Sequence, residues 1–537
     1  MPTTIDGLVR AAVGARPDAL ALADAPNRDT FFGGKTRRLT WHELDQAIDS
    51  FAGQLADLGV APQTPVAIQL PNVAELAVAI LACTRLRAIA VPFPIQHRSH
   101  ELRSGLAVAG AKVMITGPRP DRPDQLETVA SVLAEFDTTG DNDARPAIVL
   151  ATCDSAEAAG AATLSFDGLT TPPNPPSGMA ATPDDLATVC WTSGTTGIPK
   201  GVPRTNAMWL ASAGVQVDQL DITSEDRILC PFPIVNMAGI GGMLVPWAMA
   251  GCALYLHQPL DMAVFMGQIE EERITYTVAP PPLLNGLLRN EAMLDAVDLS
   301  SIRAISSGSA PLDPWMVTGW QDRGIEIVNV FGSNEGASLL STQRVVPDPA
   351  QRARFFPPPT AEGVTVRLVD LDSGDDITDV GRPGELRFTG PTVFDGYLES
   401  TGEEFDERGY YRTGDVFQWT GTDDPPSLLQ FIDRSKDIII RGGMNISAAE
   451  VEALASSHDD VAECAAVAFP DADLGERVGL FVVAAPGASP SLDTIIAHLR
   501  AQEIASYKLP ERVELVEALP RNPVGKVTKS ELRARWQ

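Results

Sequence analysis

The sequence predicts an α/β protein with a large N-terminal domain of parallel, helix-covered sheets plus a β-rich subdomain, and a small, mobile C-terminal α+β domain. Segments with helical spacing of apolar residues alternate with short, apolar, β-prone segments over most of the chain, which predicts the parallel sheets. The stretch Val364–Ile432 is instead rich in β-prone residues and in Gly and Asp turns, which predicts the subdomain.

The alternation begins after Leu39-Thr40. Apolar residues in His42–Leu58 recur at helical spacing, and Gly59 stops this helix. The elements expected next are the strand Pro65–Leu70, the helix Glu75–Leu86, the strand Ala88–Val91, the helix Ser99–Ala109 and the strand Lys112–Thr116. Between Gly117 and Pro183, clusters of Pro, Gly, Asp and Thr predict loops, with one short strand at Ala147–Ala151.

Alternation resumes at Ala187 and gives way to a small unit near the C-terminus. Further strands are expected at Ala187–Trp191, Arg227–Pro231, Cys252–Leu256, Thr275–Val278, Ile302–Ser306 and Glu326–Val330. The small unit is expected to contain the helix Ala448–Ser457, the strands Val461–Phe469 and Gly479–Ala485, the helix Leu492–Gln502 and the strand Arg512–Val516. We therefore expect a large domain over residues 1–432 and a small one over residues 433–537, with a hinge near 433–437.

The charge balance restricts the partners of the chain. With 41 basic and 70 acidic residues the formal net charge is −29, which argues against non-specific binding of nucleic acid and of anionic membrane surfaces. A site for an anionic ligand must therefore be built locally, from loop amides and a few placed cations.

The cysteines, histidines and N-terminus favour a cytoplasmic protein. The six cysteines include no C-x-x-C pair, as expected of reduced, buried thiols, and the six histidines form no metal-type cluster. The N-terminus lacks a basic region followed by an apolar core, so we expect no signal peptide. The apolar run Leu244–Leu256 is too short to insert across a membrane.

The most informative motif is the run of hydroxyl-bearing residues and glycines from Thr192 to Gly197, followed by Lys200. Such a loop leaves backbone N–H groups free to wrap a polyanion, and the lysine adds a point charge. The loop follows the apolar strand Ala187–Trp191 and lacks the Walker A spacing. Judged alone, it fits a flexible surface linker about equally well.

Two carboxylates occupy positions typical of nucleotide sites. Glu335 follows the strand that ends at Val330, and open α/β sheets place ligands at such strand ends. A carboxylate there can hold a Mg²⁺ ion that is shared with phosphates. Asp415, presented by the turn Thr413-Gly414, can accept hydrogen bonds from both hydroxyls of a ribose. Taken singly, Glu335 also fits a surface glutamate in a turn, and the Asp415 motif is more often an ordinary Asx turn.

Two later segments suggest movement and charge neutralisation. The charged segment Asp433–Asp437 leads to a strand and the double glycine Gly442-Gly443, which suits a hinge whose backbone dihedral angles change between two states. Charge at a domain boundary is, however, usually a solvated linker. Lys526 lies in a polar turn near the C-terminus, where most isolated lysines do nothing specific.

Taken together and in this order, the motifs resemble those of the adenylate-forming superfamily, which includes acyl-CoA synthetases and aryl-acid adenylating enzymes. The resemblance covers nearly the whole chain, from Leu39 to Val527. Further matching segments are Ser307–Leu312, Gly384–Leu386 and Gly396-Tyr397. Within the family the chain is most similar to enzymes that activate small aryl or alicyclic acids. The segments that carry this likeness are Val202–Thr205, Phe331–Gly336, Ser447–Glu452 and Tyr507–Pro510.

The resemblance implies an ATP-dependent carboxylate–CoA ligase that works through an acyl-adenylate, with ATP, Mg²⁺ and CoA as cofactors and a small acid as substrate. It assigns the chemistry to Lys526, Lys200, Glu335 and Asn334, with Glu335 as the metal ligand. Lys526 would bridge the acid and the α-phosphate, and the small domain would rotate about Lys436 before CoA reacts. The residues assigned to nucleotide and CoA binding are Thr192, Ser193, Gly194, Thr195, Thr196, Gly197, Ser309, Phe331, Gly332, Ser333, Asp415, Arg434, Lys436, Arg441, Gly442 and Gly443.

The acid pocket is where this chain departs from the family pattern. The resemblance places Ile234, Asn236, Met237 and Gly308 in the pocket, with Ile234 at a position where relatives carry His. We therefore expect the wall of the acid pocket to be apolar, with Asn236 as a polar side chain that contacts the acid. Asn206 replaces a second common His, and Asn334 replaces a common Thr whose hydroxyl lies near the α-phosphate. An amide can still donate a hydrogen bond there.

CoA is favoured as the acceptor for two reasons. The loop begins Thr192-Ser193-Gly194, as in CoA ligases, whereas aryl-acid ligases that act on carrier proteins often begin with Gly. The acidic chain would also repel a carrier protein, since these are themselves acidic. The alternatives are a stand-alone acid–AMP ligase that loads a carrier-protein pantetheine, and a non-catalytic nucleotide- or acyl-binding relative.

Overall fold

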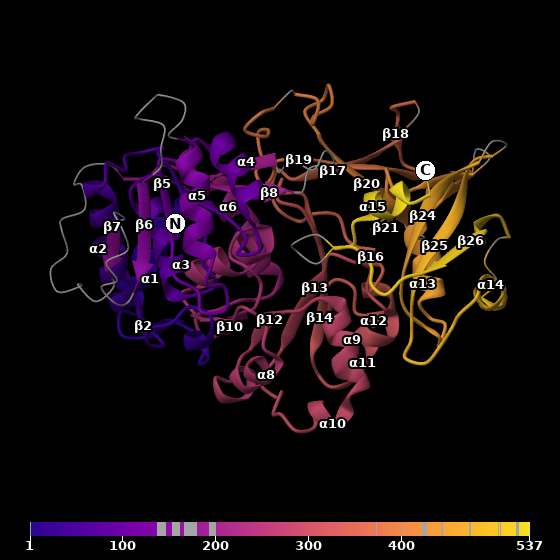
Figure 1. Ribbon diagram of the computed structural model, residues 1–537, viewed down its shortest axis with the longest axis horizontal. Coiled ribbons are helices and arrows are strands. Elements are labelled where there is room, and N and C mark those ends of the chain that lie inside the picture. The colour runs from indigo at the N-terminus through magenta and orange to yellow at the C-terminus, as the bar shows by residue number, and fades with distance from the viewer. Residues whose placement is uncertain are drawn as a thin grey trace. The chain divides into compact units, whose positions relative to one another are not determined.

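The chain forms two compact units (Figure 1). The computed structural model describes residues 2–136, 147–152, 162–165, 180–192, 200–371, 373–400, 402–421, 427–441, 444–471, 474–502, 504, 506–521 and 526–536. The first unit comprises Met1–Thr365 and Thr389–Tyr411, and the second comprises Val366–Phe388 and Arg412–Gln537. The second unit therefore draws strands from within the predicted large domain, and the boundary at residue 433 stays a prediction.

The first unit contains a seven-stranded sheet with the order β7-β6-β5-β3-β4-β8-β9. All neighbouring strands are parallel except β8 and β9, which form an antiparallel pair at the edge. The strands are β3 (Pro65–Ile68), β4 (Ile89–Pro92), β5 (Val113–Thr116), β6 (Ala147–Thr152), β7 (Ala162–Ser165), β8 (Leu186–Thr192) and β9 (Lys200–Thr205).

A second sheet of the first unit has eight strands in the order β15-β14-β13-β12-β10-β11-β1-β2. Its inner pairs are parallel, and β15 and β2 close the two edges in antiparallel fashion. The strands are β1 (Leu20–Ala23), β2 (Arg38–Thr40), β10 (Arg227–Cys230), β11 (Ala253–Leu256), β12 (Tyr276–Val278), β13 (Ala304–Gly308), β14 (Glu326–Gly332) and β15 (Ser338–Ser341). The short strand β16 (Phe355–Phe356) also belongs to this unit.

Helices cover both sheets, as buried apolar side chains at helical spacing require. Leu102 and Leu106 of α4 and Val132 of α5 pack on the first sheet, and Phe265 of α8 and Met316 of α11 pack on the second. The helices of this unit are α1 (Ile5–Ala15), α2 (Trp41–Asp57), α3 (Ala74–Arg85), α4 (Ser99–Ala109), α5 (Gln125–Phe136), α6 (Asn206–Gln219), the π-helix Met237–Leu244, α7 (Val245–Ala250), α8 (Met262–Glu271), α9 (Pro281–Arg289), α10 (Glu291–Leu294), α11 (Pro314–Asp322) and α12 (Pro349–Arg352).

The second unit is α+β. One sheet has the order β21-β20-β19-β17-β18 and another the order β23-β22-β25-β24, with β26 parallel to β25. Val451 of α13 and Leu499 of α14 pack on one face of β25, and Trp536 stacks on Phe481 of the other face at 4.0 Å between ring centroids. Its elements are β17 (Thr365–Val369), β18 (Asp376–Ile377), β19 (Pro383–Thr389), β20 (Tyr411–Thr420), β21 (Leu428–Arg434), β22 (Ile439–Arg441), β23 (Met444–Ile446), α13 (Ala448–Ala455), β24 (Val461–Asp471), β25 (Gly475–Ala484), α14 (Leu492–Ala501), β26 (Arg512–Leu515) and α15 (Lys529–Ala534).

The architecture confirms the predicted α/β class, with parallel, helix-covered sheets and a separate C-terminal α+β part. The apolar run Leu244–Leu256 is divided among the end of the π-helix, α7 and β11. Among the described residues, no helix combines the length and the apolar character that crossing a membrane requires.

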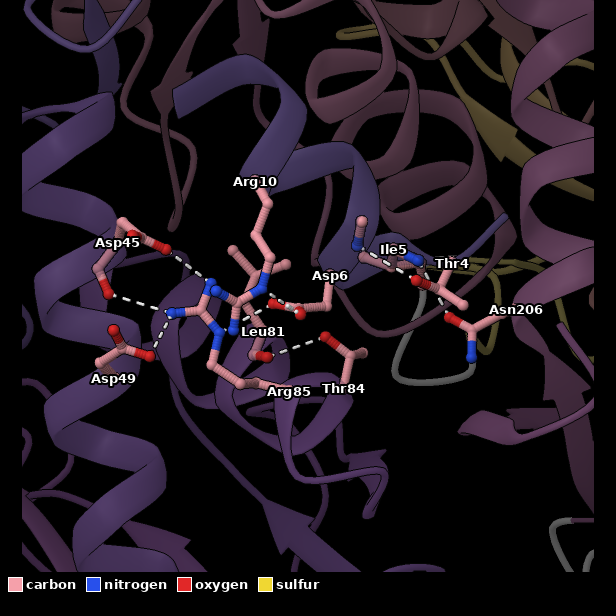
Figure 2. Close-up of polar contacts among 11 residues, drawn as sticks. Thr4, Ile5, Asp6, Arg10, Asp45, Asp49, Leu81, Thr84, Arg85 and Asn206 are labelled. Carbon is pink, nitrogen blue, oxygen red and sulfur yellow. Dashed lines mark hydrogen bonds and ion pairs between the residues drawn. The ribbon is translucent and has the colours of Figure 1, made fainter. Parts of the chain in front are cut away.

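Arg85 joins the first three helices of the chain (Figure 2). Its guanidinium, on α3, pairs with Asp6 of α1 at 2.8 Å and with Asp45 and Asp49 of α2 at 2.6 Å each. Burial alone lowers the pKa of Arg85, but the three carboxylates outweigh it and hold the pKa above its usual range. The side chain is only 2% exposed, so the cluster is a buried ionic cross-link.

Asn206 anchors the same helix α1 to the end of β9. Its Oδ1 accepts a hydrogen bond from the Ile5 N–H at 3.0 Å (Figure 2), and its Nδ2 donates to the carbonyls of Thr182 and Asp185 at 3.2 and 3.3 Å. The residue is 2% exposed. Asn206 therefore has a structural role, as a link between α1 and the segment Thr182–Asp185.

We predict that Arg85→Met destabilises the first unit by about 3 kcal/mol or more, because it leaves three neighbouring carboxylates without their buried cation. Arg10 is the matched control, since it also pairs with Asp6 but is 51% exposed. Arg10→Met is expected to cost less than about 1 kcal/mol. Urea denaturation followed by tryptophan fluorescence compares the two, and equal midpoints would contradict the role given to Arg85.

His97 is a buried, neutral histidine beside the strand that enters the Thr192–Gly197 loop. It contacts Phe93 edge-on, and Phe93 stacks on Trp191 of β8 at 5.1 Å between ring centroids. Burial lowers the pKa of His97 to about 4, and the side chain is 8% exposed.

This pKa predicts a loss of stability on acidification. Between about pH 6.5 and pH 4 the unfolded chain binds a proton at His97 that the folded chain does not, so unfolding becomes more favourable as the pH falls. In His97→Gln the thermal midpoint should fall less steeply over this window than in the wild type. Gln replacement of the exposed His42 serves as the control and should leave the pH profile unchanged. Identical slopes for the wild type and His97→Gln would refute the assignment.

Candidate active site

Two of the predicted motifs lie side by side at one edge of the eight-stranded sheet. Strands β13 and β14 are parallel neighbours with Gly308 opposite Val330, so Ser307–Ser309 and Phe331–Glu335 emerge together. A Cβ atom on Gly308 would lie 2.0 Å from the Val330 carbonyl oxygen, so only glycine permits this approach. The predicted residues Ser309, Phe331, Gly332 and Ser333 therefore share this edge.

The turn after β14 presents Glu335. The Ser333 and Gly336 N–H groups bond to the carbonyls of Ala337 and Ser333 at 3.0 and 3.1 Å. Gly336 has φ +95°, and a Cβ there would meet the Thr392 carbonyl oxygen at 1.8 Å. The backbone of the turn is thus fixed by its own hydrogen bonds and by the close approach of the turn that contains Thr392.

Glu335 and Lys200 are connected through Tyr397. The Tyr397 hydroxyl donates to Glu335 Oε1 at 2.9 Å, and the Lys200 Nζ lies 4.7 Å from the centroid of the Tyr397 ring. Burial raises the pKa of Tyr397 above its usual range, and the charge of Glu335 adds to the effect. Glu335 is 5% exposed. The predicted metal ligand and the predicted phosphate-binding lysine therefore flank one phenol ring.

Asn334 bonds to two other predicted segments. Its Nδ2 donates to the Trp191 carbonyl at the end of β8 at 2.9 Å, and its Oδ1 accepts from the Met237 N–H at 2.8 Å. In the β8–β9 hairpin Thr192 lies opposite Lys200. The loop residues Ser193, Gly194, Thr195, Thr196 and Gly197 lie outside the described residues.

Arg204 of β9 is a buried cation behind this turn. Its guanidinium donates to the carbonyls of Asn334 and Met208 at 3.3 and 3.2 Å and to Ser212 Oγ at 2.9 Å, and it lies over the Trp209 ring. Burial lowers the pKa of Arg204 to about 10, while the charge of Glu335 opposes the shift. Arg204 therefore stays charged at neutral pH and offsets the Glu335 carboxylate.

The segment predicted to bind the acid follows β10. Ile234 is fully buried, and Asn236 caps the π-helix because its Oδ1 accepts from the Gly239 N–H at 3.1 Å. Asn72, also fully buried, donates from Nδ2 to the Phe232 carbonyl at 2.7 Å and accepts from the Ile234 N–H at 3.1 Å. The roles of Ile234, Asn236, Met237 and Gly308 in reading the acid stay predictions.

The second unit carries the predicted ribose site. Asp415 and Arg434 are paired across β20 and β21, with 3.4 Å between Arg434 Nε and Asp415 Oδ1. The turn before Asp415 is held by Thr413, whose hydroxyl donates to the Leu386 carbonyl, and by the Gly414 N–H, which donates to Glu385 at 3.1 Å. The matched segment Gly384–Leu386 thus supports the position of Asp415, which is 6% exposed.

The predicted hinge is bonded to the C-terminal helix. Arg533 of α15 pairs with Asp437 and donates to the Lys436 carbonyl at 3.1 Å. Burial lowers the pKa of Lys436, and the charge of Arg434 adds to it. Lys526 is exposed and lies just before Val527, which forms a bridge with Arg521. Arg441 pairs with Glu511 at 2.9 Å, whereas Gly442 and Gly443 lie outside the described residues.

Comparison with known families identifies the chain. A family model described as AMP-binding enzyme matches residues 9–398, and one described as AMP-binding enzyme C-terminal domain matches residues 450–526. The chain belongs to the AMP-binding enzyme family. The predicted enzyme class, an ATP-dependent, AMP-forming acid ligase, is thereby confirmed.

Relatives cover almost the whole of this AMP-binding enzyme. Feruloyl-CoA synthase of Amycolatopsis sp is 30% identical, over 93% of this chain and 94% of its own length. Indoleacetate–CoA ligase of Aromatoleum aromaticum is 32% identical, over 93% of each chain. A Mycobacterium tuberculosis CoA ligase named for a propanoate with a methyl-dioxo-octahydroindenyl group is 32% identical, over 99% of this chain and 98% of its own.

Solved structures show the same fold. ATP-bound MatB from Rhodopseudomonas palustris has a TM-score of 0.82 at 24% identity and covers 100% of this chain and 99% of its own. The anthranilate CoA ligase AuaEII in complex with anthranoyl-AMP has a TM-score of 0.82 at 22% identity, covering 99% of this chain and 97% of its own.

The residues of the AMP-binding enzyme's first unit suit Mg²⁺ and phosphates. In proteins Mg²⁺ is usually held by one or two carboxylates together with substrate phosphates, which fits the single carboxylate of Glu335. The described residues contain no cluster of three or more His, Cys, Asp or Glu that could hold a metal without phosphates. The buried hydroxyls of Ser307 and Ser333, at the same strand ends, have no hydrogen-bond partner in the described part of the chain.

Sequence reasoning missed several residues of this AMP-binding enzyme. Gly396-Tyr397 matches a family motif, but the match assigns no role to Tyr397. The sequence signal for a functional tyrosine was its place in that motif. Arg204, Asn72 and Arg533 gave no comparable signal, because their partners lie far away in the sequence: Arg204 bonds to Asn334, 130 residues later, and Asn72 to Phe232, 160 residues later.

We predict graded losses in two Tyr397 variants. Tyr397→Phe removes the hydrogen bond to Glu335 but keeps the ring beneath Lys200, and should lower kcat/KM for MgATP about tenfold. Tyr397→Leu also removes the cation–π contact and should lower it about threefold further. Steady-state kinetics at saturating acid measures both values. Equal values for the wild type and Tyr397→Phe would contradict the proposed orientation of Glu335.

Proposed function

We propose that the chain joins a compact aryl, alicyclic or short-chain carboxylic acid to CoA, at the expense of ATP and through an acyl-adenylate. The observation that carries this proposal is the hydrogen-bonded cluster around Asn334 and Glu335. One turn carries the predicted metal ligand Glu335. Through Asn334 the same turn bonds to Trp191 of β8 and to Met237 of the predicted acid segment, and Tyr397 bonds to Glu335. A carboxylic acid and a nucleotide triphosphate are the two ligands that these segments suit.

The first half-reaction joins two anions. A carboxylate oxygen of the acid attacks the α-phosphorus of ATP, the bond from that phosphorus to the bridging oxygen of the β-phosphate breaks, and pyrophosphate leaves. Catalysis is then mainly positioning and charge stabilisation. Lys200 and the Thr192–Gly197 loop hold the β- and γ-phosphates, Asp415 and Arg434 bind the ribose, and Lys526 offsets the repulsion between the carboxylate and the α-phosphate. Glu335 would hold Mg²⁺, which would supply further positive charge at the phosphates.

The second half-reaction transfers the acyl group to sulfur. The CoA thiolate attacks the acyl carbon, the bond from that carbon to the phosphate oxygen breaks, and AMP leaves. Rotation of the C-terminal part about Lys436 separates the two half-reactions, and the Arg441–Gly443 segment lines the path of the pantetheine arm. Support for CoA comes from the relatives, which are CoA ligases, and from the net charge of −29, which disfavours an acidic carrier protein. A cytoplasmic location stays a prediction.

The chemical class of the acid is inferred from the relatives and from Ile234, which is predicted to line the acid pocket. Three relatives are named for ferulate, indoleacetate and a fused-ring propanoate, each of which carries a ring, and a fourth, from Escherichia coli, is named for a medium-chain fatty acid. Ile234 presents an aliphatic group where an imidazole is common, and the segment around it is firmly bonded to Asn72. We therefore propose a ring-bearing carboxylic acid as the preferred substrate.

A panel of acids tests the proposal. Ferulate, indoleacetate, benzoate, cyclohexanecarboxylate, butyrate and octanoate are each incubated with the chain, MgATP and either CoA or a phosphopantetheinylated carrier protein, and AMP release is measured. Acid-dependent release with CoA supports the proposal. Release with the carrier alone would identify a carrier-loading ligase. ATP binding without acid-dependent exchange of labelled pyrophosphate would identify a non-catalytic relative.

We predict that Lys526→Ala slows acid-dependent pyrophosphate exchange on the order of 10²-fold, because it removes a preorganised charge at the reacting centre. The same variant should convert a synthetic acyl-adenylate and CoA to thioester at nearly the wild-type rate. Arg500→Ala is the matched control, since it removes one exposed cation from the same unit. It should leave both rates unchanged. Undiminished exchange in Lys526→Ala would overturn the role of the lysine.

A further inference from the structure

Asn334 stands where the family resemblance leads us to expect a threonine, and both ends of its side chain are bonded to the protein. Its Nδ2 donates to the Trp191 carbonyl at 2.9 Å, and its Oδ1 accepts from the Met237 N–H at 2.8 Å. A side-chain amide can do both at once because it carries a donor and an acceptor on separate atoms. Asn334 therefore links β8, which enters the phosphate loop, to the start of the π-helix.

The Met237 contact fixes one end of the segment Phe232–Met237. The other end is fixed by Asn72, which bonds to the Phe232 carbonyl and to the Ile234 N–H at 2.7 and 3.1 Å. Between the two amides, Asn236 caps the π-helix through the Gly239 N–H. The predicted acid segment is thus hydrogen-bonded to Asn72 near its start and to Asn334 at its end. Of these two asparagines, Asn334 also bonds to β8.

The backbone of Asn334 is held as firmly as its side chain. Its carbonyl accepts from Arg204 at 3.3 Å, and Arg204 is itself fully buried. The Glu335 carbonyl accepts from the Phe394 N–H at 2.8 Å. A shift of the turn would therefore be transmitted to the acid segment through Met237 and to the phosphate loop through Trp191.

We propose that Asn334 is a positioning residue that sets the acid segment against the end of β8, so that the acid carboxylate meets the α-phosphate in register. The inference rests on the proposed function and deepens it. A threonine cannot replace the amide, because its single hydroxyl sits one bond closer to the backbone and cannot reach both Trp191 and Met237. Direct contact with the nucleotide, by contrast, would be retained by threonine.

Asn334→Thr therefore separates the two roles. If Asn334 positions the acid segment, the variant should lower kcat/KM for the best acid of the panel about tenfold or more while leaving KM for MgATP within about twofold. It should also weaken the discrimination between that acid and a homologue with one methylene more. If Asn334 acts only by touching the nucleotide, Asn334→Thr should retain the wild-type values, which would overturn the proposal.

Asn329, on the strand β14 that leads into the turn of Asn334, provides a matched control. It is 4% exposed, and its Nδ2 donates to the carbonyls of Arg352 and Ala353 at 3.0 Å each. Asn329→Thr loses two buried hydrogen bonds of the same kind, so it should lower the thermal midpoint about as much as Asn334→Thr. It should leave kcat/KM for the acid unchanged. An equal loss of acid kcat/KM in both variants would reduce Asn334 to a general stabilising role and refute the proposal.

Hydrogen exchange tests the linkage without relying on turnover. In the full-length chain without ligands, the Met237 N–H is protected by Asn334, so peptides covering residues 232–240 should exchange about tenfold faster in Asn334→Thr and at the wild-type rate in Asn329→Thr. Unchanged exchange over 232–240 in Asn334→Thr would overturn the linkage even if every acid of the panel is turned over. Faster exchange in a chain that activates no acid would retain the linkage and reject the proposed function.

Discussion

The geometry of the first unit's site depends on the turn that follows β14. Its two polar side chains have different roles. Asn334 bonds to the ends of two other segments, and Glu335 presents a carboxylate that accepts a hydrogen bond from Tyr397. The turn can do this because the neighbouring backbones approach so closely that Gly308 and Gly336 have no room for a Cβ atom. Two glycines without side chains thereby determine where two functional side chains stand.

Charge is the second constraint on this protein. A chain with a net charge of −29 repels polyanions at long range, so a phosphate site has to be built from individual cations in protected surroundings. Arg204 and Lys200 illustrate two ways of doing so. Arg204 is buried, bonds to neutral acceptors and stays charged, whereas Lys200 is exposed and lies against the face of Tyr397. Burial strengthens the field of Arg204 because less water screens it.

Periodicity and motif order were enough to predict the fold class and most strands, since each depends on neighbouring residues. The helix Ser99–Ala109 and the strand end at Leu256 match the prediction, and the strand end at Cys230 differs from it by one residue. The strand β9 and the π-helix Met237–Leu244 were not predicted, because a glycine-rich apolar run fits either a helix or a loop. The linking role of Asn334 could not be predicted either, since Trp191 and Met237 are 143 and 97 residues away. Such contacts follow from packing and leave no local pattern.

The account combines a positioned acid, an immobilised triphosphate and a few cations that reduce the repulsion between them. Its central claim is that the acid's own oxygen becomes bonded to the α-phosphorus. The most direct measurement uses the best acid of the panel labelled with ¹⁸O in its carboxylate, MgATP and CoA, with mass spectrometry of the products. The account predicts one ¹⁸O atom in AMP for each thioester formed and none in pyrophosphate. Label in pyrophosphate or orthophosphate, or unlabelled AMP alongside thioester, would contradict it.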